Sequence, residues 1–206
     1  MSFYEDCSVK ELILFDSTKP MADVPVIFAV GISAVILNNI IFSIVLSQKK
    51  GIDKTLKDEE ETEYQSYKDK GISPVILGFS EILNSAIYAP LIEELFFRFL
   101  LFKLVLIKAF KLNPHIANFI HACIFGSLHM TNAVMSDQQI NRTILQSCMA
   151  GVGGLISGYT YMYTNTIFTP LLSHFINNMI ASGNEFIDYA HYYATISNTI
   201  ETFKFL

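Results

Sequence analysis

The sequence predicts an all-α fold, a polytopic membrane bundle of about six transmembrane helices around a polar cavity. Two observations predict it. Of the 206 residues, 51% are hydrophobic and only 16% are charged. The charges are also absent over long distances: no Asp, Glu, Lys or Arg occurs in 42 residues at Thr143–Asn184, 25 at Leu112–Ser136 or 23 at Val24–Leu46. A soluble domain needs charged groups over its surface, so these stretches indicate lipid. The net charge of −5 argues against nucleic acid as a partner.

The first three helices are expected at 24–46, 72–89 and about 90–111. A helix of about 20 apolar residues crosses a hydrocarbon core of about 30 Å, and the first segment satisfies this alone. A polar loop follows it. Pro90 is expected to open the third helix, because proline is tolerated in the first helical turn.

The last three helices are expected at 115–131, 143–163 and 167–183. Asn113-Pro114 ends the third helix and precedes the fourth. The 42-residue uncharged stretch would be about 63 Å long as one helix, so it must fold back. Thr164-Asn165-Thr166 supplies the turn. The total is six spans, or five if the third helix is re-entrant or oblique.

These spans divide the chain into four segments and place it in the membrane as a multi-pass protein. The segments are an N-terminal tail (1–23), a first transmembrane helix with its polar loop (24–71), a core (72–184) and a C-terminal tail (185–206). The lipid bilayer is therefore an expected partner.

A group of charged residues stands near the start of the third helix. An ionisable side chain inside an apolar span is costly unless it faces a cavity or the interior of the bundle. Glu94 and Arg98 are four residues apart, so they can pair on one helix face. Glu93 lies about 100° around the axis and is left free. A free carboxylate at this position is suited to proton transfer.

Two further helices carry polar residues in apolar surroundings. His129 stands in the fourth span, and His174 and Asn178 share one face of the sixth. Small residues on the fifth helix would let backbones approach closely: Gly151, Gly153, Gly154, Ser157 and Gly158. His121, eight residues before His129, is a weaker candidate. Each group alone also fits a hydrogen bond that only holds the bundle together. Together the residue types suit hydrolysis, with a carboxylate or histidine to activate water and neutral donors for an oxyanion.

The polar groups occur in an order that resembles a known family. The pattern consists of Glu93-Glu94-x-x-x-Arg98, then Phe125-x-x-x-His129, then His174-x-x-x-Asn178. It is similar to the three motifs of the CPBP intramembrane proteases, also called the CAAX-protease and bacteriocin-processing or Abi family, which includes the Rce1-type CAAX prenyl endopeptidases. The flanking residues 89–98, 154–159 and 170–174 add to the match, and the resemblance covers about residues 72–184.

The resemblance implies a hydrolase, an intramembrane endopeptidase that cleaves near the C-terminus of a prenylated CAAX-type or other membrane-held peptide. Glu93 would be the general base, helped by His129, and His174 and Asn178 would stabilise the oxyanion. Glu94 and Arg98 would hold Glu93 in position. Whether a metal takes part stays open, because the family has been classed as metalloproteases, yet a glutamate mechanism without an ion also fits. Two histidines and a glutamate could bind Zn²⁺.

Other functions compete with proteolysis of a CAAX substrate. Members of the family also act in bacteriocin self-immunity or as membrane scaffolds, in which the polar groups would only hold the bundle. A transporter or channel, with Glu93 and the histidines as a proton relay, is a third class. The chain is also shorter than the Rce1-type enzymes, with six expected spans against about eight.

Overall fold

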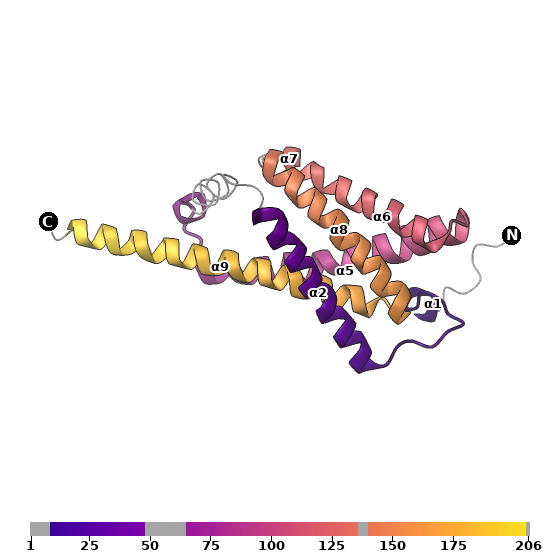
Figure 1. Ribbon diagram of the computed structural model, residues 1–206. Coiled ribbons are helices and arrows are strands. Elements are labelled where there is room, and N and C mark those ends of the chain that lie inside the picture. The colour runs from indigo at the N-terminus through magenta and orange to yellow at the C-terminus, as the bar shows by residue number, and fades with distance from the viewer. Residues whose placement is uncertain (1–8, 48–64, 136–139, 205–206) are drawn as a thin grey trace. The chain divides into compact units, whose positions relative to one another are not determined.

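The computed structural model describes residues 9–47, 65–135 and 140–204, and these residues are helical apart from short turns and one extended connection (Figure 1). The predicted all-α class is therefore confirmed for the described part of the chain. The predicted polar loop lies largely outside it, at 48–64. The chain divides into two compact units: the first comprises residues 1–48 and 90–174, and the second comprises residues 49–89 and 175–206.

The helices of the first unit carry all but one of the predicted site residues. They are α1 (Val9–Ile13), α2 (Val24–Ser47), α5 (Ala89–Glu94), η2 (Leu95–Ala109), α6 (Pro114–Leu128), η3 (His129–Thr131), α7 (Asn132–Met135), α8 (Ile140–Thr164) and the first turns of α9 (Phe168–Lys204). The second unit holds α4 (Pro74–Glu81), η1 (Ile82–Tyr88) and the rest of α9. By length and apolar composition alone, α2 is the one described helix that could cross a membrane, over Val24–Val45.

The expected helix start at Pro90 is wrong, because no non-helical residue separates Tyr88 from Pro90. Proline inside a helix lacks an N–H and clashes with the carbonyl four residues earlier. The elements η1 and η2, on either side of α5, are π-helices, whose wider turns bond residues five apart. The wide turns of η1 directly before Pro90 relieve the clash without ending the helix.

The other predicted helix ends are close to the observed ones. Asn113 caps α6, and its side-chain oxygen accepts the His115 N–H at 2.9 Å. Asn165 ends α8 with a φ of 53°, in the left-handed region that Asn tolerates. The sixth predicted helix is longer than expected, since α9 continues to Lys204 rather than ending near 183.

The helices α6 and α8 lie side by side and approach closely at glycines, as predicted (Figure 1). A Cβ built on Gly126 would lie 2.7 Å from the carbonyl oxygen of Ser147, and one on Gly154 would lie 3.0 Å from the Phe125 ring. The first distance is too short for a real Cβ atom, and the second is tighter than almost all Cβ contacts. The glycines therefore set the spacing of the two helices that frame the site.

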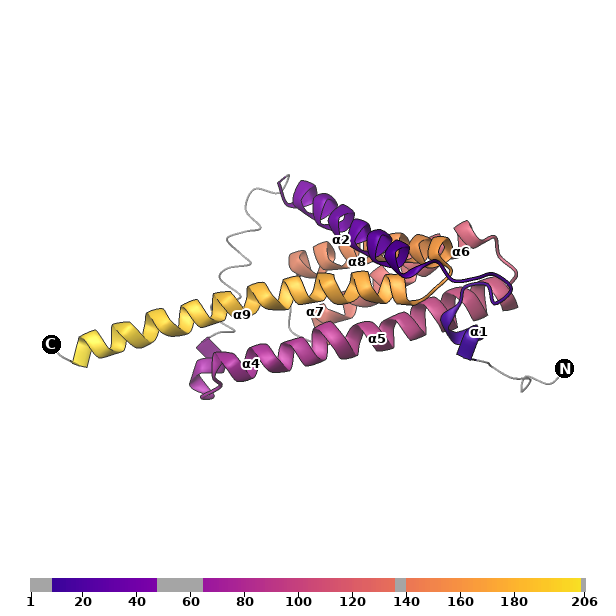
Figure 2. The same ribbon diagram turned by 90° about the horizontal axis from the view of Figure 1, so that it is seen from below.

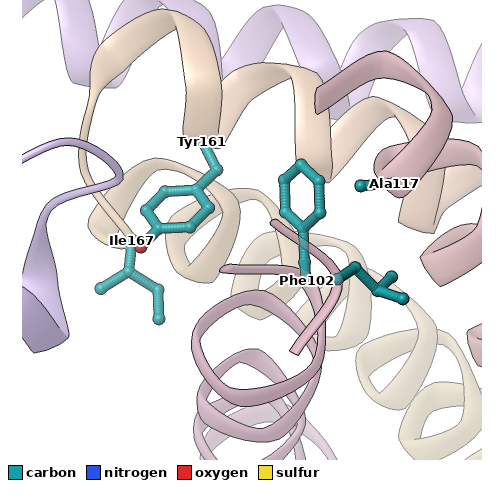
Figure 3. Close-up of a cluster of buried hydrophobic side chains, with 5 residues drawn as sticks. Phe102, Ala117, Tyr161 and Ile167 are labelled. Carbon is teal, nitrogen blue, oxygen red and sulfur yellow. The ribbon is translucent and has the colours of Figure 1, made fainter. Parts of the chain in front are cut away.

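A buried apolar cluster ties η2, α6 and α8 together at one end of the first unit. Phe102, Leu106, Ala117, Tyr161 and Ile167 form it (Figure 3). The segment after α1 packs against the same end, beside the last turns of η2, where the Lys103 ammonium donates to the Leu14 carbonyl (Figure 2). This end of the first unit is therefore fixed by both apolar and polar contacts.

Asn165 joins the N-terminal segment to the turn between α8 and α9. Its amide donates to the carbonyl oxygens of Asp16, Lys19 and Pro20 at 3.0, 3.0 and 3.1 Å, and its Oδ1 accepts the Asp16 N–H at 2.7 Å. The turn that precedes His174 is thereby held at a defined position.

The second unit is held by aromatic contacts along the C-terminal part of α9. Residues 65–69, within the predicted loop, are helical instead. Tyr67 packs edge-on against Tyr189 at 5.8 Å between ring centroids, and the Tyr189 hydroxyl donates to the Ile72 carbonyl at 2.9 Å. Burial raises the pKa of this hydroxyl. These contacts explain why the helix continues past its predicted end.

Candidate active site

The predicted pair of Glu94 and Arg98 is present and almost completely buried. Glu94 Oε2 lies 2.9 Å from Arg98 Nε, and each side chain is 1% exposed. Glu94 is the last residue of α5 and Arg98 lies in the first turn of η2, so the four-residue spacing brings them to one face. The guanidinium also lies over the Phe125 ring, 4.9 Å from Cζ to the centroid. The charge of each group is thereby compensated inside the unit.

The second oxygen of Glu94 holds His174. Glu94 Oε1 lies 2.9 Å from His174 Nδ1, across 80 residues of sequence. An ionised carboxylate can only accept, so Nδ1 carries the hydrogen and the ring is fixed in orientation. Glu94 is therefore a bridge between Arg98 and His174.

Glu93 faces the other nitrogen of the same ring. Its Oε2 lies 3.7 Å from His174 Nε2, and this oxygen is buried without a hydrogen-bond partner. The Glu93 side chain as a whole is 30% exposed, far more than that of Glu94. The two adjacent glutamates thus differ: Glu94 pairs with Arg98, as the four-residue spacing predicted, whereas Glu93 faces only His174, at a longer distance.

Phe125 brings both histidines to one aromatic ring. The His129 and His174 rings meet it edge-on, at 4.9 and 6.3 Å between centroids. His129 begins η3, where its Nδ1 lies 2.9 Å from the Phe125 carbonyl. A carbonyl accepts only, so the neutral His129 ring keeps its lone pair on Nε2, which is the form a general base requires.

Asn178 lies in the second unit. Its amide donates to the Ser85 carbonyl at 2.6 Å, and Ser85 also shares a hydrogen bond with Ser182 at 2.6 Å. It follows His174 by one helical turn in α9. Its assignment to the oxyanion stays a prediction.

The histidine and carboxylate donors do not form a metal site. Among residues 9–47, 65–135 and 140–204 no group of three or more His, Cys, Asp or Glu side chains could hold an ion. One His174 nitrogen faces Glu94 and the other faces Glu93. A single ion therefore could not be bound by His174 and both carboxylates. A description as a metalloprotease is therefore not supported by this geometry.

Two residues that make contacts in or near the site were not named as candidates for a functional role in the sequence. Phe125 is visible in the sequence only as the first position of the second motif, yet its ring contacts both histidine rings and the Arg98 guanidinium. Asn118 is fully buried on α6, where its amide donates to the Leu155 carbonyl of α8 at 3.0 Å. Its three-residue spacing to His121 is the one signal that could have singled it out.

The sequence was compared with protein families, curated proteins and solved structures. The family described as type II CAAX prenyl endopeptidase Rce1-like matches residues 75–180, which is just over half of the chain. No curated protein and no solved structure matched. The matched segment contains every residue of the three motifs, and members of this family are membrane-embedded peptidases. The chain belongs to the Rce1-like family of type II CAAX prenyl endopeptidases.

Proposed function

We propose that this chain is a multi-pass intramembrane endopeptidase that hydrolyses a peptide bond near the C-terminus of a prenylated CAAX-type peptide. The observation that carries the proposal is the Glu93 carboxylate, which has a free buried oxygen 3.7 Å from the Nε2 of a clamped His174. Glu94 already compensates Arg98, so that structural pair does not require this second carboxylate.

In the proposed reaction Glu93 is the general base. It takes a proton from water as the water oxygen attacks the scissile carbonyl, and the same proton is later delivered to the leaving amine. His129, whose lone pair is on Nε2, helps to orient the water. The tetrahedral intermediate then carries an oxyanion that needs hydrogen-bond donors.

His174 and Asn178 are the proposed oxyanion donors. His174 Nδ1–H is used by Glu94, so Nε2 is the ring nitrogen left to face the oxyanion. Asn178 gives one amide hydrogen to the Ser85 carbonyl and keeps a second for substrate. Glu94 and Arg98 act by positioning His174.

A multi-pass arrangement belongs to this proposal, in which the expected second and third spans form one helix and count as a single crossing. Large apolar side chains are exposed on several helices, as lipid contact requires: examples are Phe28, Ile36, Phe119, Leu128 and Ile144. A membrane-held substrate then reaches the site without leaving the bilayer.

Cleavage of a lipidated peptide by the purified protein in vesicles tests the proposal. A farnesylated peptide ending in a CAAX sequence is the substrate, and an unprenylated copy is its control. Glu93→Ala and His129→Ala should lower kcat/KM by about 10²-fold or more, whereas His115→Ala, on an exposed part of α6, should leave it unchanged.

Three results would contradict parts of this account. Full cleavage by Glu93→Ala would exclude Glu93 as the base. Equal inertness of wild type and variants toward all lipidated peptides would favour the immunity or scaffold function. Loss of activity in a chelator, restored by Zn²⁺, would show that a metal takes part.

A further inference from the structure

A buried donor and a buried acceptor near the site lack partners. His121 is 0% exposed and Arg98 is 1% exposed, and neither His121 Nε2 nor Arg98 Nη1 makes a hydrogen bond. Buried polar atoms of this kind are rare, because leaving one unpaired costs its full desolvation. Both lie in the first unit, within the same group of aromatic side chains.

Asn118 fixes which His121 nitrogen is the acceptor. The Asn118 amide nitrogen donates to the Leu155 carbonyl at 3.0 Å, so the amide oxygen faces the other way. This oxygen and the Asn118 backbone carbonyl each lie 3.3 Å from His121 Nδ1. Both can only accept, so the hydrogen of a neutral ring is on Nδ1 and the lone pair is on Nε2.

Aromatic packing places this lone pair near the guanidinium. Phe125 follows His121 by one turn of α6, and Arg98 Cζ lies 4.9 Å from the Phe125 ring centroid. Phe97 packs against both Phe125 and His121, at 4.7 and 6.3 Å between centroids. The unpaired donor and the unpaired acceptor therefore border the same aromatic cluster, formed by Phe97 and Phe125, and the structure shows no hydrogen bond between them.

We propose that His121 is a positioning residue, whose Nε2 accepts a hydrogen bond from the Arg98 guanidinium and so fixes His174 through Arg98 and Glu94. On one side of the proposed bond, His121 contacts Asn118, which donates to the Leu155 carbonyl of α8. On the other side, Arg98 pairs with Glu94, which holds His174 of α9. The proposed bond would join these two sets of contacts. Its kinetic consequence rests on the proposed peptidase function, whereas the contact itself does not.

Nitrogen NMR of the histidine side chains tests the contact without any substrate. In ¹⁵N-labelled protein in vesicles, assigned with His121→Gln, His121 should show a protonated Nδ1 and an unprotonated, hydrogen-bonded Nε2. Arg98→Leu should move the Nε2 resonance toward that of a free nitrogen. A protonated Nε2, or an Nε2 resonance that Arg98→Leu leaves in place, would overturn the proposal.

Kinetics then test the positioning role. His121→Leu removes the acceptor, and kcat per folded molecule should fall about 10-fold or more while KM changes by less than about twofold. His121→Gln keeps a polar acceptor and should restore most of kcat. His115→Leu, on the exposed part of the same helix, should be unaffected.

The two readouts separate the two hypotheses. If His121→Leu keeps the wild-type kcat per folded molecule, the positioning role is wrong. If wild type cleaves no lipidated peptide but the NMR contact is present, the proposed function fails and the contact stands. If His121→Leu does not fold, His121→Gln and the wild-type spectrum decide the question.

Discussion

Neighbouring glutamates in this chain have opposite environments, and their functions should differ accordingly. Glu94 is 1% exposed and is bound by both Arg98 and His174, whereas Glu93 is 30% exposed and keeps a free oxygen. Removing one partner of a buried ion pair leaves a charge without compensation, which costs about 3–5 kcal/mol. Glu93 makes only a longer contact, 3.7 Å from His174 Nε2, and is more exposed, so removing its charge should cost less stability.

Glutamine substitutions therefore separate stability from chemistry. Glu94→Gln should lose about 3–5 kcal/mol of stability together with activity. Glu93→Gln should lose activity by about 10²-fold or more and keep the melting temperature of wild type. Thermal unfolding in detergent and peptide cleavage, measured on the same samples, check both. A Glu93→Gln variant as unstable as Glu94→Gln would make Glu93 structural.

Phe125 is expected to hold the two histidine rings in position as well as to fill space. Phe125→Leu removes a ring that His129, His174 and Arg98 contact, so kcat should fall about 10-fold and stability by about 1–2 kcal/mol. Phe119→Leu, at an exposed position of the same helix, is the matched control and should be close to wild type in both measurements. Equal effects of the two substitutions would count against the role of Phe125.

Local patterns predicted a contact within one helix but not the contacts between distant parts of the chain. The four-residue spacing was enough to predict the Glu94–Arg98 pair, because that pair depends only on helix geometry. The contact of Glu94 with His174 joins residues 80 apart, and no local pattern encodes it. The same holds for Asn118, whose partner Leu155 is on another helix.

At the level of helices, close approach of α6 and α8 depends on particular glycines. Gly126→Ala would place a methyl group 2.7 Å from the Ser147 carbonyl oxygen and 3.0 Å from the Gly151 backbone, which cannot move aside as a side chain would. The expected cost is about 1–3 kcal/mol. Gly183→Ala, with no neighbour within 4 Å, should be neutral or stabilising by up to about 1 kcal/mol. Unfolding of the two variants compares them, and equal stability would contradict the packing.

The N-terminal segment should loosen in acid. The Asp16 carboxylate accepts hydrogen bonds from the Thr18 hydroxyl and N–H and pairs with Lys19, which lowers its pKa to about 2. Because the pKa in the folded state is below the ordinary value, this contribution is present above about pH 4 and is lost as the pH falls toward 2.

The Asn165 side-chain amide, which contacts Asp16, reports this change. Its NMR resonances should shift between about pH 4 and 2 in wild type and stay constant in Asp16→Asn. A pH-dependent shift that persists in Asp16→Asn would assign the effect to another group.

Helix positions were predictable from the uncharged stretches and their Asn and Pro boundaries, with two exceptions. Pro90 does not begin a helix, because the preceding π-helical turns accommodate it, and wide turns leave no signature in apolar periodicity. The extension of α9 to Lys204 depends on tyrosine contacts with residues more than a hundred positions earlier, such as Tyr189 with Ile72. Both exceptions come from packing rather than from local preference.

For the whole molecule, the proposal requires stable integration in the bilayer. Alkaline carbonate removes peripheral proteins from membranes and leaves proteins with apolar transmembrane helices in place. The chain should remain in the membrane pellet, and so should a variant in which Val24–Val45 is deleted, because further helices span the bilayer in the proposed arrangement. Release of the deletion variant into the supernatant would limit the membrane attachment to that helix.

The most direct test of the central claim is the single-turnover rate of farnesylated CAAX peptide cleavage by Glu93→Gln in vesicles, with its melting temperature measured alongside. The account predicts a product rate at least about 10²-fold below that of wild type in a variant that melts at the wild-type temperature. A wild-type rate in Glu93→Gln would contradict it.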